Sequence, residues 1–532
     1  KGEGPGKFSL SVGGKKMTSP LGAEGSAWMW QIAGKVSVKN LKTVIKLHDL
    51  TGFDGRCDAI YFTTEVGKMP PSDVKELEAF RRQALGLPDE APVAGEYDLV
   101  VVGAGIAGMS AAVSAARLGC RVALINDRPV VGGNNSSEIR VHLGGRIEEG
   151  TYKELGGLQK EFGPEKGGNA QPAEYYEDQK KMDWLAGEKN VSLFLNFRAI
   201  GVTKEGDKIT SVIVKHIESG KELKFEAPLF SDCTGDGTIG YLAGADYRMG
   251  REGRDEYGES IAPEKADKLT MGSSVQWYSV DNKKSSPFPE FGYGVEFNDK
   301  NCEKVMMGEW TWETGMNFDQ IKDFERIRDY GMLVVYSNWS YLKNRMKEND
   351  QYKNRKLGWV AYVAGKRESR RLMGDYILKE DDITKNVSHE DASFATTWSI
   401  DLHWQDPKNS EHFPGNEFKA VTKHILIHPY AVPYRCLYSR NVDNLFMAGR
   451  NISVTHVALG TVRVMRTTGM MGEVVGMAAS LCKKYDVTPR GVYRSHLEDL
   501  KTLMKEGVNK KGLPNNQRYN EGGMLKDKPV VQ

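Results

Sequence analysis

The sequence predicts an α/β fold in which a parallel-sheet domain is interrupted by an inserted domain and preceded by a small β-sheet module. The first observation is the order strand, helix, strand at the start of the main domain. Apolar residues run from Tyr97 to Val102, helical periodicity follows at Ile106–Leu118, and a second apolar strand covers Arg121–Ile125. Continuous apolar strands that alternate with helices are typical of a parallel sheet buried on both faces.

The second observation is that the same character returns late in the chain. A strand is predicted at Asn444–Ala448 and a helix at about Met465–Cys482. The third observation is that residues 246–435 hold seven of the ten tryptophans and have a less regular periodicity. We therefore expect a substrate-facing domain to be inserted into the parallel-sheet domain.

Residues 1–66 are predicted to form a half-buried antiparallel sheet. Alternating apolar and polar residues indicate strands at Lys7–Val12, Trp28–Ile32 and Val44–His48. The rings of Trp28 and Trp30 would share one strand face, either as part of a core or as a platform that stacks on sugar rings.

Further elements lie between these regions. Ser72, after two prolines, is the predicted N-cap of a helix. Short strands are predicted at Val191–Leu195, Ile209–Lys215 and Leu223–Phe225. The predicted domains are a partial β-sandwich module (1–66), a helical linker (67–96), the first part of the main domain (97–245), the inserted domain (246–435), the second part of the main domain (436–490), and a C-terminal helix and tail (491–532).

Composition narrows the function classes. Lys and Arg together number 73 against 71 for Asp and Glu, so no net charge attracts nucleic acid or anionic lipid. The six cysteines lack paired C-x-x-C spacing, and we predict no metal site. The longest uncharged run, Leu99–Ala116, is broken by three glycines and two serines, so we expect no membrane span. The cluster Lys366–Arg371 is open to two interpretations: a solvated helix face or structural ion pairs on one side, and an anion site on the other.

The first chemical motif is a glycine-rich turn between the first strand and its helix. Gly103, Gly105 and Gly108 have the spacing G-x-G-x-x-G, with Ile106 and Ala107 at the start of the helix. The first glycine permits a tight turn, the second lets the backbone approach a pyrophosphate, and the third lets helix and strand pack closely. The free N–H groups of the helix then bind the phosphates. This pattern predicts a dinucleotide site.

The second strand ends in a departure from the usual pattern. An acidic residue normally holds the adenosine ribose there, but this chain has Asn126, followed by Asp127. An amide can still bond to a ribose hydroxyl.

Three further motifs separate FAD from NAD. Arg128–Ser137, with Gly132 and Gly133, resembles the second glycine-rich turn of glutathione-reductase-type flavoproteins. Leu229–Gly237 resembles their central strand ending in Thr-Gly, and Asn441–Arg450 resembles their last strand ending in Ala-Gly. Together with Gly365–Arg371 and Gly460–Thr467, these residues resemble the FAD-dependent oxidoreductase family found in Bacteroidetes and related bacteria, distantly akin to fumarate reductase flavoproteins. The resemblance covers about residues 97–485 and implies an FAD/NAD(P)-binding Rossmann-like fold.

The resemblance implies a set of cofactor contacts. In these relatives the helix after the last strand points its N-terminus at the flavin pyrimidine ring. Relatives that bind FAD covalently use a His where this chain has Glu138, so we expect non-covalent FAD, although His142 is nearby. Arg450 replaces the acidic residue that contacts the ribityl chain and favours a phosphate or carboxylate oxygen instead. The expected cofactor-binding residues are Gly103, Gly105, Ile106, Ala107, Gly108, Asn126, Asp127, Arg128, Gly132, Gly133, Asn134, Asn135, Ser136, Arg140, Ala199, Ile200, Thr234, Gly235, Asp236, Gly449, Arg450, Met470 and Met471.

Candidates for catalysis are histidines and arginines near the expected flavin edge. His456 is predicted in the loop after the last strand, His428 before that strand, and His403 beside Trp404 in the inserted domain. A neutral His can take the proton of a hydroxyl group while hydride passes to flavin N5. Arg466 and Arg463 are candidates for holding an anionic substrate or the flavin.

These residues leave three functions open. The first is FAD-dependent oxidation or reduction of a small polar substrate, such as a sugar or a sugar-derived acid. The pair Trp310-x-Trp312, whose rings would share one strand face, gives indirect support for a sugar. The second is reduction of an unsaturated carboxylic acid, with Arg466 or Arg463 as the carboxylate site. The third is a carbohydrate-binding protein with structural FAD.

The N-terminal segment Leu41–Thr64 resembles the end of a golvesin-like β-sandwich, a module that accompanies secreted carbohydrate-active proteins, some of them labelled xanthan lyase. The chain begins at Lys1 and not at Met, so we expect a processed chain. These features favour a periplasmic or secreted location, with a small-molecule substrate and no nucleic-acid partner. The electron acceptor and the oligomeric state are not predicted.

Overall fold

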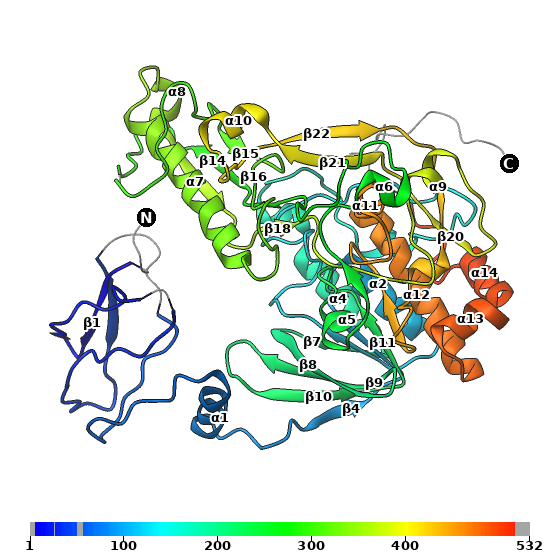
Figure 1. The fold of residues 1–532 in the computed structure, drawn as a ribbon, viewed down its shortest axis with the longest axis horizontal. Helices are drawn as coiled ribbons and strands as arrows, with labels where there is room; N and C mark the ends of the chain where they lie inside the picture. Colours follow the sequence, from blue (N-terminus) through cyan, green and yellow to red (C-terminus); the bar gives the residue numbers. More distant parts are fainter. Residues whose placement is uncertain (1–5, 26, 51–56, 291, 516–532) are drawn as a thin grey trace. The chain divides into compact units, whose positions relative to one another are not determined.

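The computed structural model describes residues 6–25, 27–50, 57–290 and 292–515. Its contacts divide the chain into two compact units (Figure 1). One is formed by the residues up to Glu90, and the other by nearly all residues from Ala91 onward.

The first unit contains a three-stranded antiparallel sheet with strand order β2-β1-β3. Its strands are β1 (Phe8–Val12), β2 (Lys15–Lys16) and β3 (Ile45–Asp49). The first and third predicted strands are therefore confirmed, but residues 28–32 form no strand. Trp28 is 67% exposed, and the indole N–H of Trp30 donates to the Pro71 carbonyl at 3.2 Å. The shared strand face predicted for these tryptophans is wrong.

Helix α1 (Val74–Ala84) follows this sheet in the chain. Its N-cap is Asp73, whose carboxylate accepts from the N–H groups of Lys75 and Glu76 at 3.0 and 3.1 Å. The predicted cap, Ser72, lies one residue too early, because a charged carboxylate binds these N–H groups and the helix dipole more strongly than a hydroxyl. Residues 51–56, inside the golvesin-like segment, and residues 516–532 of the predicted tail lie outside the described residues.

The second unit is built on a five-stranded parallel sheet with the order β24-β11-β5-β6-β7. Its strands are β5 (Leu99–Val102), β6 (Val122–Ile125), β7 (Val191–Phe194), β11 (Leu229–Asp232) and β24 (Leu445–Met447). Because the strands are parallel, the loops that follow β5, β6, β11 and β24 meet at one edge, where open α/β sheets bind ligands. The predicted parallel sheet and its late strand are confirmed.

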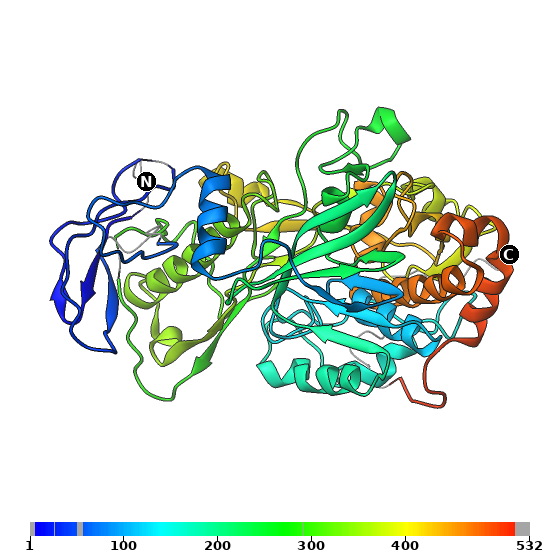
Figure 2. The same cartoon turned by 90° about the horizontal axis from the view of Figure 1, so that it is seen from below.

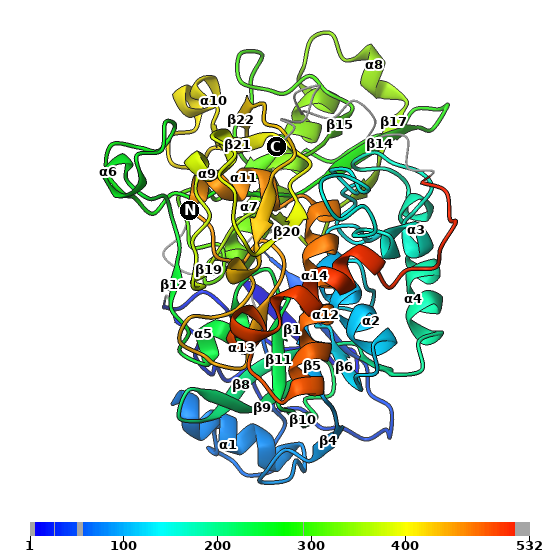
Figure 3. The same ribbon diagram turned by 90° about the vertical axis from the view of Figure 1, so that its right-hand side faces the viewer.

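Two long helices pack together beside this sheet, α2 (Ile106–Arg117) and α12 (Met465–Tyr485) (Figure 3). A Cβ atom on Gly472 of α12 would lie 2.1 Å from the carbonyl oxygen of Ala107, so only glycine permits this approach. The Ser114 hydroxyl donates to the Glu473 carbonyl at 2.8 Å. The small residues of α12 therefore serve close packing between helices.

The second unit also contains a mixed four-stranded sheet with the order β4-β10-β9-β8 (Figures 1 and 2). Its strands are β4 (Val93–Glu96), β8 (Phe197–Glu205), β9 (Lys208–His216) and β10 (Glu222–Glu226), and β4 pairs in parallel with β10. The predicted strands at 209–215 and 223–225 are confirmed and are slightly longer than expected.

A second hydrophobic core lies between residues 275 and 418. It contains Trp277, Trp312 and Trp339, with α7 (Phe324–Asn344) on one side and β14 (Trp277–Asp281), β15 (Met307–Gly308) and β17 (Arg355–Val360) forming a small sheet. This core falls inside the predicted insertion. Residues such as Leu372 and Leu402, however, belong to the core of the parallel-sheet domain.

The remaining elements are short. The helices are α3 (Leu158–Phe162), α4 (Asp178–Ala186), α5 (Thr238–Leu242), α6 (Arg254–Tyr257), α8 (Asp350–Lys353), α9 (Glu380–Thr384), α10 (Pro407–His412), α11 (His456–Val462), α13 (Pro489–Ser495) and α14 (Leu497–Glu506), with single 3-10 turns at Ala173–Tyr176 and Tyr434–Cys436. The strands are β12 (Tyr247–Arg248), β13 (Ser273–Ser274), β16 (Glu313–Thr314), β18 (Gly365–Lys366), β19 (Arg371–Leu372), β20 (Ala392–Ala395), β21 (Ile400–Gln405), β22 (Ala420–Ile425) and β23 (Ala431–Pro433). Over the described residues, no helix has the length and apolar character needed to cross a membrane.

Glu473 makes stability depend on pH. Burial raises the pKa of this α12 carboxyl group to about 8, although it accepts from the N–H groups of Gly156 and Leu158. The folded state therefore holds a proton that the unfolded state releases near its ordinary value, so stability should fall as pH rises toward 8. We expect the unfolding free energy of the wild type, measured relative to that of Glu473→Gln, to fall by a few kcal/mol from pH 5 to pH 9 in urea titrations. A difference that does not change with pH would contradict this.

Candidate functional site

The glycine-rich turn after β5 leaves a helix N-terminus open. Gly103 has φ +102°, and a Cβ atom on Gly108 would lie 1.8 Å from the Gly103 carbonyl oxygen. Gly105 is the N-cap of α2, and no side chain caps the helix there, although Ile106 and Ala107 are buried. Buried N–H groups without partners are costly, so this end is built for a ligand that accepts hydrogen bonds.

The second glycine-rich turn lies against the first. The Gly132 N–H donates to the Ala104 carbonyl at 2.8 Å, and a Cβ atom on Gly133 would lie 3.1 Å from Gly105. Fully buried Lys181 of α4 supports this turn, because its ammonium donates to the Asn135 carbonyl at 2.8 Å. Burial lowers the pKa of Lys181 to about 8. The two turns therefore form one rigid cradle.

The polar side chains of the second turn form hydrogen bonds with backbone carbonyl groups of the protein. The Asn134 amide donates to the Lys366 carbonyl at 3.1 Å, the Asn135 amide to the Val141 carbonyl at 2.8 Å, and the Ser136 hydroxyl to the Gly133 carbonyl at 2.7 Å. The Oδ1 atom of Asn135 is buried without a hydrogen-bond partner among the described residues.

Asn126 and Asp127 follow β6. The Asn126 Oδ1 atom accepts from the Ala104 N–H at 3.2 Å, and its amide donates to the carbonyls of Arg128 and Val130 at 3.1 and 2.9 Å. Its side chain therefore fixes both turns. Asp127 is an exposed residue. The surrounding loops still remove part of the water around its carboxylate, which raises its pKa, and the charges of Arg198 and Arg128 oppose this rise. Of the two, Asp127 has the carboxylate exposed for a ribose hydroxyl.

Several residues beside the second turn are held in contacts within the protein. The Arg128 guanidinium pairs with Glu138 at 2.6 Å. Arg140, at φ +68°, donates from Nε to the Ser137 carbonyl at 2.8 Å and stacks on Trp359, with 3.9 Å from Cζ to the ring centroid. The His142 ring contacts Asn169 at 3.0 Å, and burial lowers its pKa.

The loops after β11 and β24 meet in a charged group centred on Asp236. Its carboxylate contacts Lys366 Nζ at 2.5 Å, Ser369 Oγ at 2.8 Å and Arg450 Nη2 at 3.1 Å. Burial alone would raise the pKa of Asp236, but Lys366 and Arg450 hold it well below its usual range. The Arg450 Cζ atom lies 2.6 Å from the position of a Cβ on Gly235, so the guanidinium lies directly over that glycine.

The remaining residues expected to contact the cofactor lie on several different elements. Thr234 donates from its hydroxyl to Asp232 at 2.6 Å, and Gly449 follows β24 with φ +120°. Ala199 is buried and Ile200 is 41% exposed, at a register shift in β8. Met470 and Met471 are buried on α12.

Residues Gly365–Leu372 join this edge of the sheet to the candidate catalytic residues. Lys366 and Ser369 contact Asp236. Arg367, Glu368 and Arg371 are buried; Arg367 pairs with Glu313, Arg371 with Glu252, and Glu368 with His456. The interpretation of this cluster as a solvated helix face is wrong. The segment forms no helix; it begins with the short strand β18 and ends with the short strand β19. The alternative of structural ion pairs is confirmed, because burial forces every charge to find a partner.

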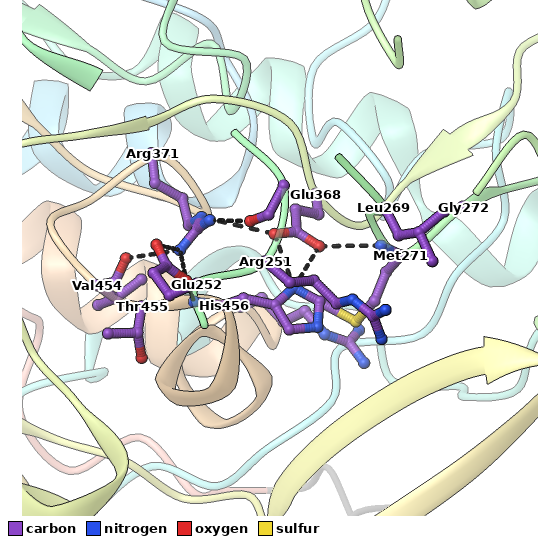
Figure 4. Close-up of polar contacts among 12 residues, drawn as sticks. Arg251, Glu252, Leu269, Met271, Gly272, Glu368, Arg371, Val454, Thr455 and His456 are labelled. Carbon is purple, nitrogen blue, oxygen red and sulfur yellow. Dashed lines mark hydrogen bonds and ion pairs between the residues drawn. The ribbon is translucent and has the colours of Figure 1, made fainter. Parts of the chain in front are cut away.

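His456 and Glu368 form the first buried pair (Figure 4). The His456 Nδ1 atom lies 2.9 and 3.0 Å from the two oxygens of Glu368. Burial would raise the pKa of Glu368, but His456 and Arg371 lower it, and the Met271 N–H donates to it at 2.9 Å. The His456 Nε2 atom is buried without a hydrogen-bond partner among the described residues. His456 begins helix α11 and does not lie in the predicted loop.

His403 and Glu313 form the second pair. The His403 Nδ1 atom lies 2.7 Å from Glu313 Oε2, and the Gly272 N–H donates to the other oxygen at 2.6 Å. Burial would raise the pKa of Glu313, but Arg367 and His403 hold it at about 2. The His403 Nε2 atom contacts Arg463 Nη2 at 3.0 Å. The consecutive amides of Met271 and Gly272 thus bind the two glutamates, which brings both histidines into one network.

The remaining candidates, His428 and Arg466, lie in other surroundings. His428 lies between β22 and β23, and its Nδ1 atom is buried without a hydrogen-bond partner among the described residues. Arg466, in the first turn of α12, is buried beside Gly145 and interacts electrostatically with His142. Trp310 and Trp312 do not share a strand face: Trp312 packs on Trp277 in the core, whereas Trp310 lies 5.3 Å from the His403 ring centroid.

Sequence reasoning missed three acidic residues, Glu313, Glu368 and Asp401. Asp401 lies two residues before His403 on β21, so strand alternation puts both on one face and could have revealed it. Glu368 is the single acid in a basic run, which is a weaker signal. Nothing near Glu313 in the sequence indicates that it reaches His403.

The glycine-rich turn gives a test that separates binding from folding. A Cβ atom on Gly105 meets only Gly133, at 3.9 Å, and its φ of −70° suits any residue. We expect Gly105→Ala to fold with an unchanged melting temperature but to bind FAD about tenfold more weakly or worse, because the methyl group takes the phosphate's space. Gly108→Ala should instead destabilise the fold by about 1–3 kcal/mol. Flavin fluorescence titration and thermal unfolding measure both, and equal FAD affinity of Gly105→Ala and wild type would contradict the site.

Comparisons with known proteins agree with this geometry. A family described as FAD dependent oxidoreductase matches residues 98–504. No curated protein matches the sequence.

Solved structures give distant similarities. A reductase-like protein from Thermoplasma acidophilum, described as geranylgeranyl bacteriochlorophyll reductase-like, has 15% identity over 77% of this chain and 83% of its own, with a TM-score of 0.32. L-proline dehydrogenase from P. horikoshii has 14% identity over 92% of this chain and 67% of its own, with a TM-score of 0.28. Glycerol-3-phosphate dehydrogenase from Bacillus halodurans, complexed with FAD, has 12% identity over 36% of this chain and 41% of its own, with a TM-score of 0.24.

The family match covers most of the chain, including both glycine-rich turns, the segment Gly365–Leu372 and the two histidine pairs. The chain therefore belongs to the FAD dependent oxidoreductase family.

Proposed function

We propose that the enzyme oxidises a hydroxyl group of a small polar substrate, a sugar or a sugar-derived acid, and that His456 takes the hydroxyl proton. The observation that carries this proposal is the Glu368–His456 pair. A carboxylate on Nδ1 fixes the ring as the tautomer with its proton on Nδ1, so the lone pair of Nε2 is available. The buried Nε2 atom of His456 has no other partner among the described residues.

His403 does not suit this role because its second ring nitrogen already has a partner. With Nδ1 donating to Glu313, Nε2 accepts from Arg463 at 3.0 Å. A lone pair held by a guanidinium is not available to a substrate proton. We assign His403 as a positioning residue for Arg463.

The residues at the edge of the parallel sheet fit FAD. The open N-terminus of α2 would hold the pyrophosphate, with Asp127 at the adenosine ribose and Arg450 at a phosphate oxygen. The start of α12, with Arg466, would face the flavin. When bound, FAD accepts the hydride that leaves the carbon carrying the hydroxyl group.

With FAD bound as the hydride acceptor, the proton of the substrate hydroxyl group would pass to His456 Nε2, and the substrate would leave as a carbonyl compound. Glu368 would stabilise the imidazolium that forms, because its carboxylate lies 2.9 Å from His456 Nδ1. Burial of both groups excludes water and strengthens this interaction.

Reduction of an unsaturated acid is less well supported. That reaction needs a cation to bind the substrate carboxylate, and Arg463 already contacts Asp401 at 3.1 Å. A carbohydrate-binding protein with structural FAD would not need an oriented imidazole with a free nitrogen.

Variants of the pair test the proposal. We expect His456→Asn to slow flavin reduction by hydroxylated substrates about 10²–10⁴-fold, and Glu368→Gln to slow it about tenfold or more, with FAD content unchanged. Anaerobic stopped-flow absorbance against a panel of sugars measures these rates.

The exposed His412 of α10 provides a matched control, and His412→Asn should leave the rate unchanged. Flavin reduction by His456→Asn at the wild-type rate would contradict the assignment of His456 as the base. A large loss in His428→Asn with none in His456→Asn would move the base to His428. Rapid oxidation of the reduced enzyme by unsaturated acids, without bleaching by any sugar, would favour the alternative reaction.

A further inference from the structure

The charges around His403 and His456 are arranged in pairs. Around His403 lie two arginines and two acids, all from the second unit. Arg367 Nη1 lies 3.4 Å from Glu313 Oε2, and Arg463 Nη2 lies 3.1 Å from Asp401 Oδ2. Each cation therefore has its own carboxylate.

The surroundings of Asp401 and Glu313 keep both carboxyl groups ionised. Burial would raise the pKa of Asp401, but Arg463, His403 and His424 hold it well below its usual range. The indole N–H of Trp398 also donates to Asp401 at 3.3 Å. Glu313, with a pKa of about 2, carries a full charge at neutral pH.

The same pairing holds on the side of His456. Arg371 Nη1 contacts Glu252 Oε1 at 2.8 Å, and Arg251 Nε contacts Asp267 Oδ1 at 3.0 Å. Both arginines are shown with Glu368 and His456 in Figure 4. None of these four arginines is left to balance a charge brought by a substrate.

Building on the proposed function, we propose that this site selects a neutral sugar or polyol and rejects the corresponding sugar acid, and that Asp401 sets this selectivity. A substrate carboxylate at Arg463 would lie beside Asp401 and Glu313. Like charges placed side by side in a buried site repel each other and weaken binding. A hydroxyl group brings no charge and can bond to the same guanidinium.

Trp310 suits the same substrate. Its ring lies 5.3 Å from the His403 ring at an interplanar angle of 60°, and it is partly exposed, unlike the core residue Trp312. An aromatic ring of this kind packs against the C–H face of a sugar. The arrangement places an apolar surface and a neutralised guanidinium side by side.

Matched pairs of sugars test the selectivity, since glucose and glucuronate, and likewise galactose and galacturonate, differ only at one carbon. Dissociation constants of the FAD-loaded enzyme are read from perturbation of the flavin spectrum, and reaction from anaerobic bleaching. We expect the wild type to prefer the neutral member of a pair at least about tenfold. Asp401→Asn frees Arg463 and should reverse or abolish the preference by improving binding of the acid.

Two further variants separate the effect of charge from a folding defect and from a general change of net charge. Asp401→Asn combined with Arg463→Gln restores charge balance and should lose the gain for acids, which separates charge from folding defects. Glu411→Gln, at an exposed residue of α10, changes charge equally and should leave the preference as in wild type.

Acids that bind wild type as tightly as neutral sugars, or no change of preference in folded Asp401→Asn, would overturn the inference. Neutral sugars that bind with this selectivity but never bleach the flavin would overturn the proposed function and leave the selectivity standing. Binding of no member of any pair would overturn both.

Discussion

The structure of the site depends on charge compensation among buried side chains. Segment Gly365–Leu372 carries four basic residues and one acid into the protein, and burial of an unpaired ion costs far more than any single contact returns. Three of these charges pair with groups from other elements: Lys366 binds Asp236, Arg367 binds Glu313, and Glu368 binds His456. Because these partners belong to distant parts of the chain, one extended segment sets the geometry of both the cofactor loops and the histidines.

The parallel sheet supplies the other half of the arrangement. Its strands end at one edge, which brings together the two glycine-rich turns, Asp236 and Arg450. Asn126 couples the turns through three hydrogen bonds to backbone groups, so the cradle is rigid before any ligand enters. A preformed cradle does not lose the entropy of ordering its loops when the dinucleotide binds. The two halves meet where Lys366 contacts Asp236.

Local patterns predicted the sheet well because its strands are short, apolar and punctuated by glycine. The turn at Gly103, the helix from Ile106 and the helix from Met465 were all predicted from periodicity and turn residues. The pairing of Glu313 with His403 could not be, because 90 residues separate them and no periodic signal spans that distance. The predicted cap at Ser72 and the predicted strand face shared by Trp310 and Trp312 failed for a related reason, since propensities alone do not choose between neighbouring polar or aromatic residues.

The central claim is that FAD binds at this edge with its reactive face toward His456 Nε2. A crystal structure of the FAD complex tests it most directly. We predict the pyrophosphate over the N–H groups of Ile106 and Ala107, and a space beside flavin N5 in which a substrate hydroxyl comes within about 3 Å of His456 Nε2. A dinucleotide bound elsewhere, or an imidazole whose Nε2 faces away from the flavin, would contradict the account.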